Sequence, residues 1–433
     1  MLYFLIFILG GIAYSNPLFY PAFFVASIVF YMRKYVQLRQ KNVDSTNCIL
    51  ILMGYALPFS WRSLIGSHYS SLPISWFYIL GMLYTASVLL RSNKIIIRKN
   101  GSLLLFSMLS LIIAALPLLY IPIGFNKQAL TQFIVLSFNN VLIFTSVFQS
   151  GTLNSNGMAL VKRAYVTGAV MTSCMLIIQF VVYKGLGVQF GYIDYLRNRE
   201  LLYFLFADIS HGTLYLATAA FWIIYDGQNG GHIVFNYALV FIIIFGSALT
   251  SARTGLFILF LFVFMFTLIA QQGFIKRLFT ILMLGFGGYY SFQVIQSVRN
   301  FDTVGDFTNG SGRFEGYASA FQFLKMNPLL GYGYSQDYLA SILGQPIPHL
   351  SFLQYALHGG IFFALVLFST QFLILRATLK KKSVCSWLLA IVLVGTCLVP
   401  DLFATRFATL LCIIAISSQV KNSADNTLFI NAV

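Results

Sequence analysis

The sequence has 433 residues, of which 59% are hydrophobic and only 9% charged, and its mean hydropathy is +0.82. Soluble domains carry about 25% charged residues, so this composition cannot provide a solvated surface and excludes a soluble globular protein. Apolar runs of about 17–25 residues, the length that a bilayer requires, recur along the chain. We therefore predict an all-α, polytopic integral membrane protein.

Fourteen apolar segments are candidate membrane spans. The first two are short and could form one kinked span, so we expect 12 to 14 transmembrane helices. The runs are continuous rather than alternating, which excludes the strands of a β-barrel. The first run lacks the basic region and the small-residue cleavage site of a signal peptide, so we expect it to remain as a span. The segments are residues 2–14, 18–32, 48–66, 72–90, 102–122, 131–149, 164–183, 204–225, 233–250, 254–270, 278–297, 351–375, 384–400 and 405–420.

The basic residues predict the orientation of these spans. If every span crosses once, one side of the membrane receives 17 of the 27 basic residues and only three acidic ones. The positive-inside rule makes this side cytoplasmic. The net charge of +16 is therefore a signal of topology, and we expect no binding of nucleic acid. The basic residues lie in the connections 33–41, 91–100, 162–163, 276–277 and 376–382 and at Lys421, and the three acids are Asp44, Asp226 and Asp425.

The two longest connections fall on the opposite, outer side. The first, 184–203 with its flank to residue 212, supplies Arg199 and His211. The second, 298–350, is too short to fold alone. We expect it to form a helical external cap on a single transmembrane domain that comprises residues 1–433.

Arg253 lies in "SALTSARTGLFILF", where one predicted span ends and the next begins at the outer boundary. A guanidinium group there presents five donors and requires an anion, and its neighbours Ser251 and Thr254 are neutral. The alternative is an arginine that only extends its head group to the interface.

Arg313 opens the helical part of "NGSGRFEGYASAFQFLKMNPLLGYG" at 309–333. "NGSG" predicts a turn with Ser311 as the helix N-cap, and "NP" ends the helix. Arg313 would then lie in the first helical turn, near the mouth of an outer cavity, whereas a local pair with Glu315 is the alternative. "GYG" predicts a turn and not a nucleotide-phosphate loop. The apolar stripe expected on this helix consists of Phe314, Tyr317, Phe321 and Leu324.

Three further polar residues lie at outer span ends. His349, in "GQPIPHLSFLQYALHGG", ends the external loop, where a neutral imidazole can accept a proton near neutral pH. A histidine hydrogen-bonded at the interface is the alternative, and His358, further in, is expected to pack or bridge polar groups. Asp401 and Arg406, in "VPDLFATRFATLL", either pair with each other or face the same cavity.

These residues together predict a cationic cavity open to the outer side. Arginine side chains at a membrane surface suit phosphate oxygens, and a lipid-linked diphosphate is the natural anion at that depth. No D-x-D, H-x-x-x-H or outer acidic cluster is present, so we expect no metal and no cofactor, with leaving-group charge stabilised by arginine. The five cysteines lie in or beside apolar runs without a C-x-x-C pair, so we expect neither disulfides nor thiolate metal sites.

The ordered motifs "RELLYFLFADISHGTLYLA", "SARTG", "GSGRFEGYASAFQFLKMNPLLGYGY", "PHLSFLQYALHGG" and "PDLFATRF" resemble the bacterial O-antigen polymerase and O-antigen ligase superfamily. The resemblance covers roughly residues 190–410. It implies a metal-independent glycosyltransferase of the GT-C type that uses glycans linked to undecaprenyl diphosphate at the outer face of the bacterial inner membrane.

The resemblance also implies roles for individual residues. Arg253 and Arg313 would bind the diphosphate, and His349 would deprotonate or orient the acceptor hydroxyl. Asp401 and Arg406 would line the same site, and the further candidates for substrate binding are Glu315, Tyr317, Arg199 and His211. In this chain Leu350 follows His349, where the family commonly has asparagine.

Polymerase and ligase share these motifs. The compact "GRFEGY…NPLLGYGY" loop favours a polymerase, which joins lipid-linked repeat units, over a ligase, which moves the glycan onto lipid A-core. The expected partners are the undecaprenyl-diphosphate-linked glycan and membrane lipid, and a regulator of polysaccharide chain length is a further candidate. A transporter remains a lesser alternative, but it would place charges near the bilayer midplane and show an inverted repeat. A membrane scaffold without activity is the least favoured.

Overall fold

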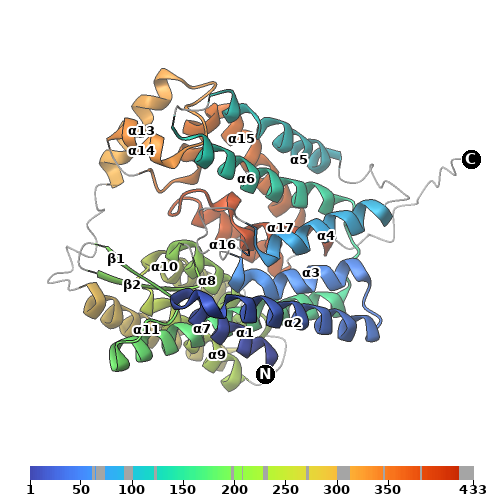
Figure 1. Cartoon of the computed structure of the whole chain (residues 1–433), viewed down its shortest axis with the longest axis vertical. Helices are drawn as coiled ribbons and strands as arrows, with labels where there is room; N and C mark the ends of the chain where they lie inside the picture. The colour runs from blue at the N-terminus through green and yellow to red at the C-terminus, as the bar shows by residue number, and fades with distance from the viewer. Residues whose placement is uncertain are drawn as a thin grey trace, which may run out of the picture.

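The computed structural model describes residues 1–60, 64, 74–91, 101–120, 124–196, 199–206, 208–227, 233–269, 273–299, 313–344, 347–380 and 383–418. Within these ranges the chain forms 16 α-helices and one two-stranded sheet (Figure 1), which confirms the all-α prediction. The helices are α1 (Leu2–Ser15), α2 (Tyr20–Gln40), α3 (Ser45–Ala56), α4 (Trp76–Arg91), α5 (Gly101–Ile113), α6 (Asn126–Val147), α7 (Ser155–Leu186), α8 (Ile209–Asp226), α9 (Ile233–Leu249), α10 (Arg253–Ile269), α11 (Phe274–Arg299), α13 (Arg313–Met326), α14 (Gln336–Leu343), α15 (Ser351–Leu379), α16 (Val384–Gly395) and α17 (Arg406–Ser417).

Each predicted span overlaps one of these helices. Five helical stretches in the described residues are long and apolar enough by themselves to cross a membrane, and seven more are apolar but shorter. A bilayer allows only helices or closed barrels to cross it, because unpaired backbone groups are costly in hydrocarbon. The five long stretches are Gly101–Leu119, Asn126–Val147, Ser155–Leu186, Arg277–Gln296 and Ser351–Leu379.

The short sheet was not expected from the sequence. Strand β1 (Tyr192–Leu196) pairs antiparallel with β2 (Arg199–Phe204), and nearly all of this hairpin lies in the outer connection 184–203. The buried Gln179 of α7 holds this hairpin at its base. Its Nε2 donates to the carbonyl of Tyr192 at 2.9 Å, and its Oε1 accepts from the N–H of Phe204 at 3.1 Å. Contacts with a helix residue 13 and 25 positions away therefore stabilise the hairpin.

The described ion pairs agree with the predicted sidedness. Arg91 at the end of α4 pairs with Asp44, and Lys162 pairs with Asp226 at the end of α8. All four residues belong to the side predicted to be cytoplasmic. The hairpin and helices α13 and α14 lie at the opposite end of the bundle from the α2–α3 connection, at the left of Figure 1.

Two buried hydrophobic clusters form the interior. The first cluster is built mainly from α1–α3, α7–α10, α16 and α17, and contains Tyr165, Tyr215 and Trp222. The second cluster joins α6, α13, α14 and α15, and contains Tyr334 and Tyr355. The clusters meet where α15, α16 and α17 begin or end, and this boundary contains the candidate site.

Helix α15 is broken at Gly359 and Gly360, and the segment 327–333 packs against the break. The N–H of Tyr332 donates to the carbonyl of Leu357 at 2.7 Å, and the N–H of Ile361 donates to the carbonyl of Pro328 at 2.8 Å. The turn predicted for "GYG" is present, with φ of +66° at Gly331 and +81° at Gly333. It supplies hydrogen-bond partners to backbone groups that the break removes from the helix.

His358 joins the same two segments. Its Nδ1 lies 2.8 Å from the carbonyl oxygen of Gly333, which accepts its proton, and its Nε2 lies 3.4 Å from Gln354 Nε2. The expectation that His358 bridges polar groups inside the protein is confirmed.

The buried face of α13 differs from the predicted stripe. Leu324 is buried, but Phe321 is 52% exposed, and Ala320 is fully buried in its place. The buried face of α13, which contacts α15, contains Gly316, Ala320 and Leu324. The small residues Gly316 and Ala320, at positions i and i+4, allow the two helices to approach closely. The side chain of Phe314 and the expected N-cap Ser311 lie outside the described residues.

Candidate functional site

A turn at residues 396–405 connects α16 to α17 and lies between the two clusters. Leu402 is buried in the first cluster, and the next residue, Phe403, is buried in the second. Asp401 directly precedes these two residues. Its φ of +50° lies in the left-handed region that few residues other than glycine adopt. The surrounding contacts hold this conformation and direct the carboxyl group toward α15.

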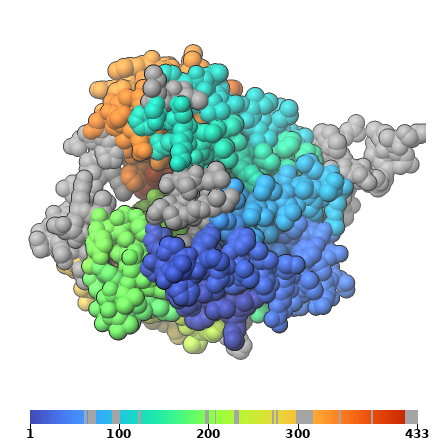
Figure 2. Space-filling model, in the orientation of Figure 1, coloured from blue at the N-terminus to red at the C-terminus, as the bar shows by residue number. Residues whose placement is uncertain are grey.

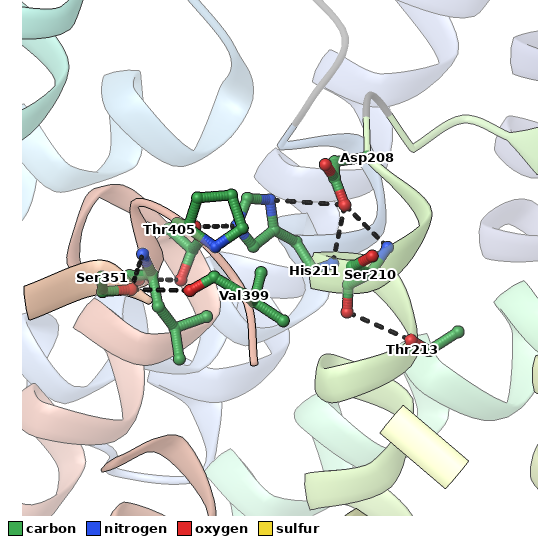
Figure 3. Close-up of polar contacts among 9 residues, drawn as sticks. Asp208, Ser210, His211, Thr213, Ser351, Val399 and Thr405 are labelled. Carbon is green, nitrogen blue, oxygen red and sulfur yellow. Dashed lines mark hydrogen bonds and ion pairs between the residues drawn. The ribbon is translucent and has the colours of Figure 1, made fainter. Parts of the chain in front are cut away.

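Helix α8 reaches this turn through His211. The imidazole Nε2 lies 2.9 Å from the carbonyl oxygen of Pro400 and donates to it, because a carbonyl can only accept. Asp208 caps α8 by accepting from the N–H groups of Ser210 and His211 at 2.6 and 3.0 Å. Figure 3 shows His211 extending from the start of α8, below Asp208, toward the turn with Val399.

Helix α15 holds the same turn from the other side. The Ser351 hydroxyl donates to the carbonyl of Val399 at 2.7 Å and accepts from the N–H of Leu402 at 3.3 Å (Figure 3). One helical turn later, the Tyr355 hydroxyl donates to Asp401 Oδ1 at 2.8 Å and accepts from the N–H of Phe403 at 3.1 Å. The position of Asp401 is therefore set by α8 and α15 together.

Burial raises the pKa of the Asp401 carboxyl to about 6. The hydrogen bond from Tyr355 and the positive charges of His211 and Arg406 act in the opposite direction but do not cancel this effect. Asp401 therefore changes its charge close to neutral pH, a property that is frequent among groups at functional sites.

Arg406 is the first residue of α17 and is only 3% exposed. Its guanidinium carbon lies 5.1 Å from the centre of the Tyr78 ring of α4, at a distance typical of a cation–π contact. The charge of Arg406 lowers the pKa of Asp401, so the two side chains lie within electrostatic range of each other. The arginine thus spans the boundary between the clusters.

Arg253 begins α10 next to α8. Gly255 allows this proximity, because a Cβ there would lie 2.4 Å from the backbone carbonyl carbon and oxygen of Thr213. Arg253 lies two residues before Gly255 on α10, and His211 lies two residues before Thr213 on α8. Both side chains therefore start close to this helix contact. The turn before it contains the buried Thr250 and Ser251, with φ of +58° at Ser251.

His349 lies two residues before α15 and is partly buried. Helices α8, α10, α15 and α17 all begin at this end of the bundle, and among the described residues no side chain caps α15 or α17. Helix N-termini carry partial positive charge. The backbone therefore adds to the positive charge of Arg253 and Arg406.

The other predicted residues are placed less completely. Arg313 and Glu315 belong to the first turn of α13, and Arg199 pairs with Leu196 in the hairpin, but the side chains of these three residues lie outside the described part of the structure. Tyr317 is partly buried and packs against the second cluster. The structure thus groups His211, Asp401 and Arg406, with Arg253 on the adjoining helix, and leaves the rest of the predicted site as a prediction.

Three residues at the site were not predicted, among them Ser351, which bonds Val399 and Leu402 from 48 and 51 positions away. Tyr355 contacts Asp401 from 46 positions away, and Tyr78 contacts Arg406 from more than 300 positions away. A weak signal exists only for Tyr355, which lies one helical turn after Ser351 and so shares its helix face. No group of three or more His, Cys, Asp and Glu side chains that could hold a metal ion occurs in the described ranges.

The molecular surface is hollowed at this end. In Figure 2 a recess lies between the orange residues of α13–α14 and the green residues around the hairpin, and red residues from the C-terminal third are visible at its bottom.

A comparison with protein families matches residues 238–369 to the O-antigen ligase family. The matched segment extends from α9 to α15 and contains Arg253, Arg313 and His349. Residues 238–369 are therefore similar to the O-antigen ligase family. No curated protein and no solved structure matches the chain.

Proposed function

We propose that this protein polymerises polysaccharide repeat units carried on undecaprenyl diphosphate, as in O-antigen or capsule synthesis. The reaction would take place at the outer, periplasmic face of the bacterial inner membrane. The observation that carries the proposal is the O-antigen ligase match over residues 238–369, which includes the three residues predicted to perform the chemistry. The polar groups gathered at the 396–405 turn, at the end opposite the basic connections, support the same location for the site.

In the proposed reaction, a hydroxyl oxygen of one repeat unit attacks the anomeric carbon of another lipid-linked glycan. The new C–O bond forms as the bond to undecaprenyl diphosphate breaks, and the diphosphate leaves with the bonding electron pair. His349 accepts the hydroxyl proton. Arg253 and Arg313 stabilise the charge that develops on the diphosphate. The reaction would thus be of the GT-C type, in which a lipid diphosphate is the leaving group.

The residues at the site turn have supporting roles in this proposal. Arg406 and the N-termini of α10 and α17 add positive charge beside the diphosphate. Asp401 and His211 bind sugar hydroxyls at the boundary between the clusters, and Glu315, Tyr317 and Arg199 contact the glycan from the external segments.

The test is complementation of a bacterial strain from which the gene has been deleted, with the polysaccharide separated as a ladder on a gel. Removing one charged contact to a transition state in a dry site costs about 2.7–4 kcal/mol, or a roughly 100- to 1,000-fold loss of rate. We expect Arg253→Lys, Arg313→Lys and His349→Ala each to abolish the long bands, since lysine lacks the bidentate geometry of arginine. Normal ladders from Arg313→Lys and His349→Ala, at normal protein levels, would overturn the mechanism.

A ligase is the second candidate, because the matching family is described as O-antigen ligase. The deletion strain distinguishes the two reactions. Loss of a polymerase leaves lipid A-core with single repeat units, whereas loss of a ligase leaves unmodified core and lipid-linked polymer. We expect single units on the core.

A further inference from the structure

A second polar site lies at the other end of the bundle, in a cleft between α2, α3 and α7. The cleft has a volume of about 230 Å³. Its floor is apolar and contains the buried Leu38 and Ile51. Three basic residues, Lys34, Lys41 and Arg163, line it, and no acidic residue does so among the described residues.

The basic side chains of the cleft lie close to one another. The Lys34 ammonium group lies 5.3 Å from the centre of the Tyr55 ring, which also lines the cleft. Burial lowers the pKa of Lys34, and the positive charges of Arg163 and Lys41 lower it further. Within the described ranges, no carboxylate forms an ion pair with any of these three cations, although Arg91 and Lys162 at the same end of the bundle each have one. The cleft therefore concentrates positive charge without a described protein anion to balance it.

The predicted spans place the cleft at the level of the lipid headgroups. Lys34 follows the predicted span 18–32 by two residues, and Arg163 immediately precedes the predicted span 164–183. Helix α7 has 32 residues, or about 48 Å at 1.5 Å per residue, whereas the hydrocarbon core is about 30 Å thick. Its first turns, with Arg163 at their end, therefore extend beyond the hydrocarbon on the basic side of the protein.

We infer that this cleft binds the phosphate group of an anionic phospholipid from the leaflet on the basic side. A single phosphate accepts hydrogen bonds from lysine and arginine together, and the apolar floor suits the glycerol and first methylene groups of a lipid better than a hydrated free anion. The lipid is a structural ligand, separate from the glycan carrier at the opposite end, so this inference does not depend on the proposed transferase activity.

The test compares lipid binding by the purified full-length protein and two double variants. Lys34→Gln with Arg163→Gln removes two cations from the cleft. The control, Arg33→Gln with Arg376→Gln, removes two cations on the same side but outside the cleft. The readouts are the number of retained phosphatidylglycerol molecules in native mass spectrometry and the unfolding temperature in nanodiscs of phosphatidylcholine with or without phosphatidylglycerol.

We expect one tightly retained phosphatidylglycerol and a higher unfolding temperature in its presence for the wild type and the control. The cleft variant should bind it about tenfold more weakly or worse and lose the thermal shift. Equal binding by the cleft variant, equal loss in the control, or equal retention of phosphatidylcholine would overturn the inference. A separate titration uses inorganic phosphate, and displacement of the lipid at millimolar phosphate, with the same thermal shift, would assign the cleft to a soluble anion instead.

Discussion

The break in α15 can be tested by adding one methyl group at Gly360. This residue has φ of +85° and ψ of +170°, a conformation available essentially to glycine alone, and forcing another residue into it costs about 1–3 kcal/mol. A Cβ there would also lie 1.9 Å from the carbonyl oxygen of Leu329 and 2.3 Å from its carbonyl carbon. Both atoms belong to the backbone, so a side-chain rotation cannot relieve the contact.

The segment 327–333 must therefore move away from the break in Gly360→Ala. This movement removes the hydrogen bond from the N–H of Ile361 to the carbonyl of Pro328, and an unsatisfied buried backbone group costs about 1–3 kcal/mol more. The expected loss of stability is about 4 kcal/mol, the sum of these two costs near the middle of their ranges, and the packing of α13 on α15 is lost with it.

Two other glycines provide matched controls. Gly344 has φ of +62°, and a Cβ added to it would have no atom within 4 Å, so Gly344→Ala should cost only the backbone conformation, about 1–2 kcal/mol. Gly288 lies inside α11 with equally open surroundings, so Gly288→Ala should be stabilising by about 0.5–1 kcal/mol. The assay is the thermal unfolding midpoint in one detergent. If Gly360→Ala unfolds no earlier than Gly344→Ala, the proposed docking of 327–333 onto the break is refuted.

Three further predictions concern the site turn and its support. Asp401→Asn should gain stability relative to the wild type, by at most about 3 kcal/mol, as the pH rises from about 4 to about 6. The reason is that the Asp401 carboxyl, whose pKa is raised from 3.8 to about 6, favours the folded state only while it is protonated. A difference in unfolding midpoint that does not change with pH would contradict this prediction. Tyr355→Phe should cost about 1–3 kcal/mol by removing the donor to Asp401, and less in an Asp401→Asn background, so additive losses in thermal unfolding would argue against the contact. Gly255→Ala should separate α8 from α10 at Thr213, which costs about 1–3 kcal/mol of stability. The displacement of Arg253 should also reduce the polysaccharide ladder. A thermal unfolding midpoint equal to that of Gly288→Ala would exclude the tight packing.

The sequence alone determined the class of this protein and the position of its helices. A bilayer imposes one local requirement, a continuous apolar run of sufficient length, and this requirement can be read without knowledge of any distant residue. For the same reason the turn at "GYG" and the helix that begins at Arg313 were predictable, because glycine, proline and capping residues act on neighbouring backbone. The predicted orientation followed from charges counted in each connection.

Only the tertiary structure decided which outer residues meet. The hairpin depends on Gln179 of a preceding helix, and the buried face of α13 depends on how closely α15 approaches it. His211 and Tyr355 lie next to Asp401 and its turn because α8 and α15 both pack on that turn. No pattern in the sequence predicts this packing. Contacts across large separations arise from the shapes of whole helix surfaces, whereas the sequence displays only the chemistry that each surface carries.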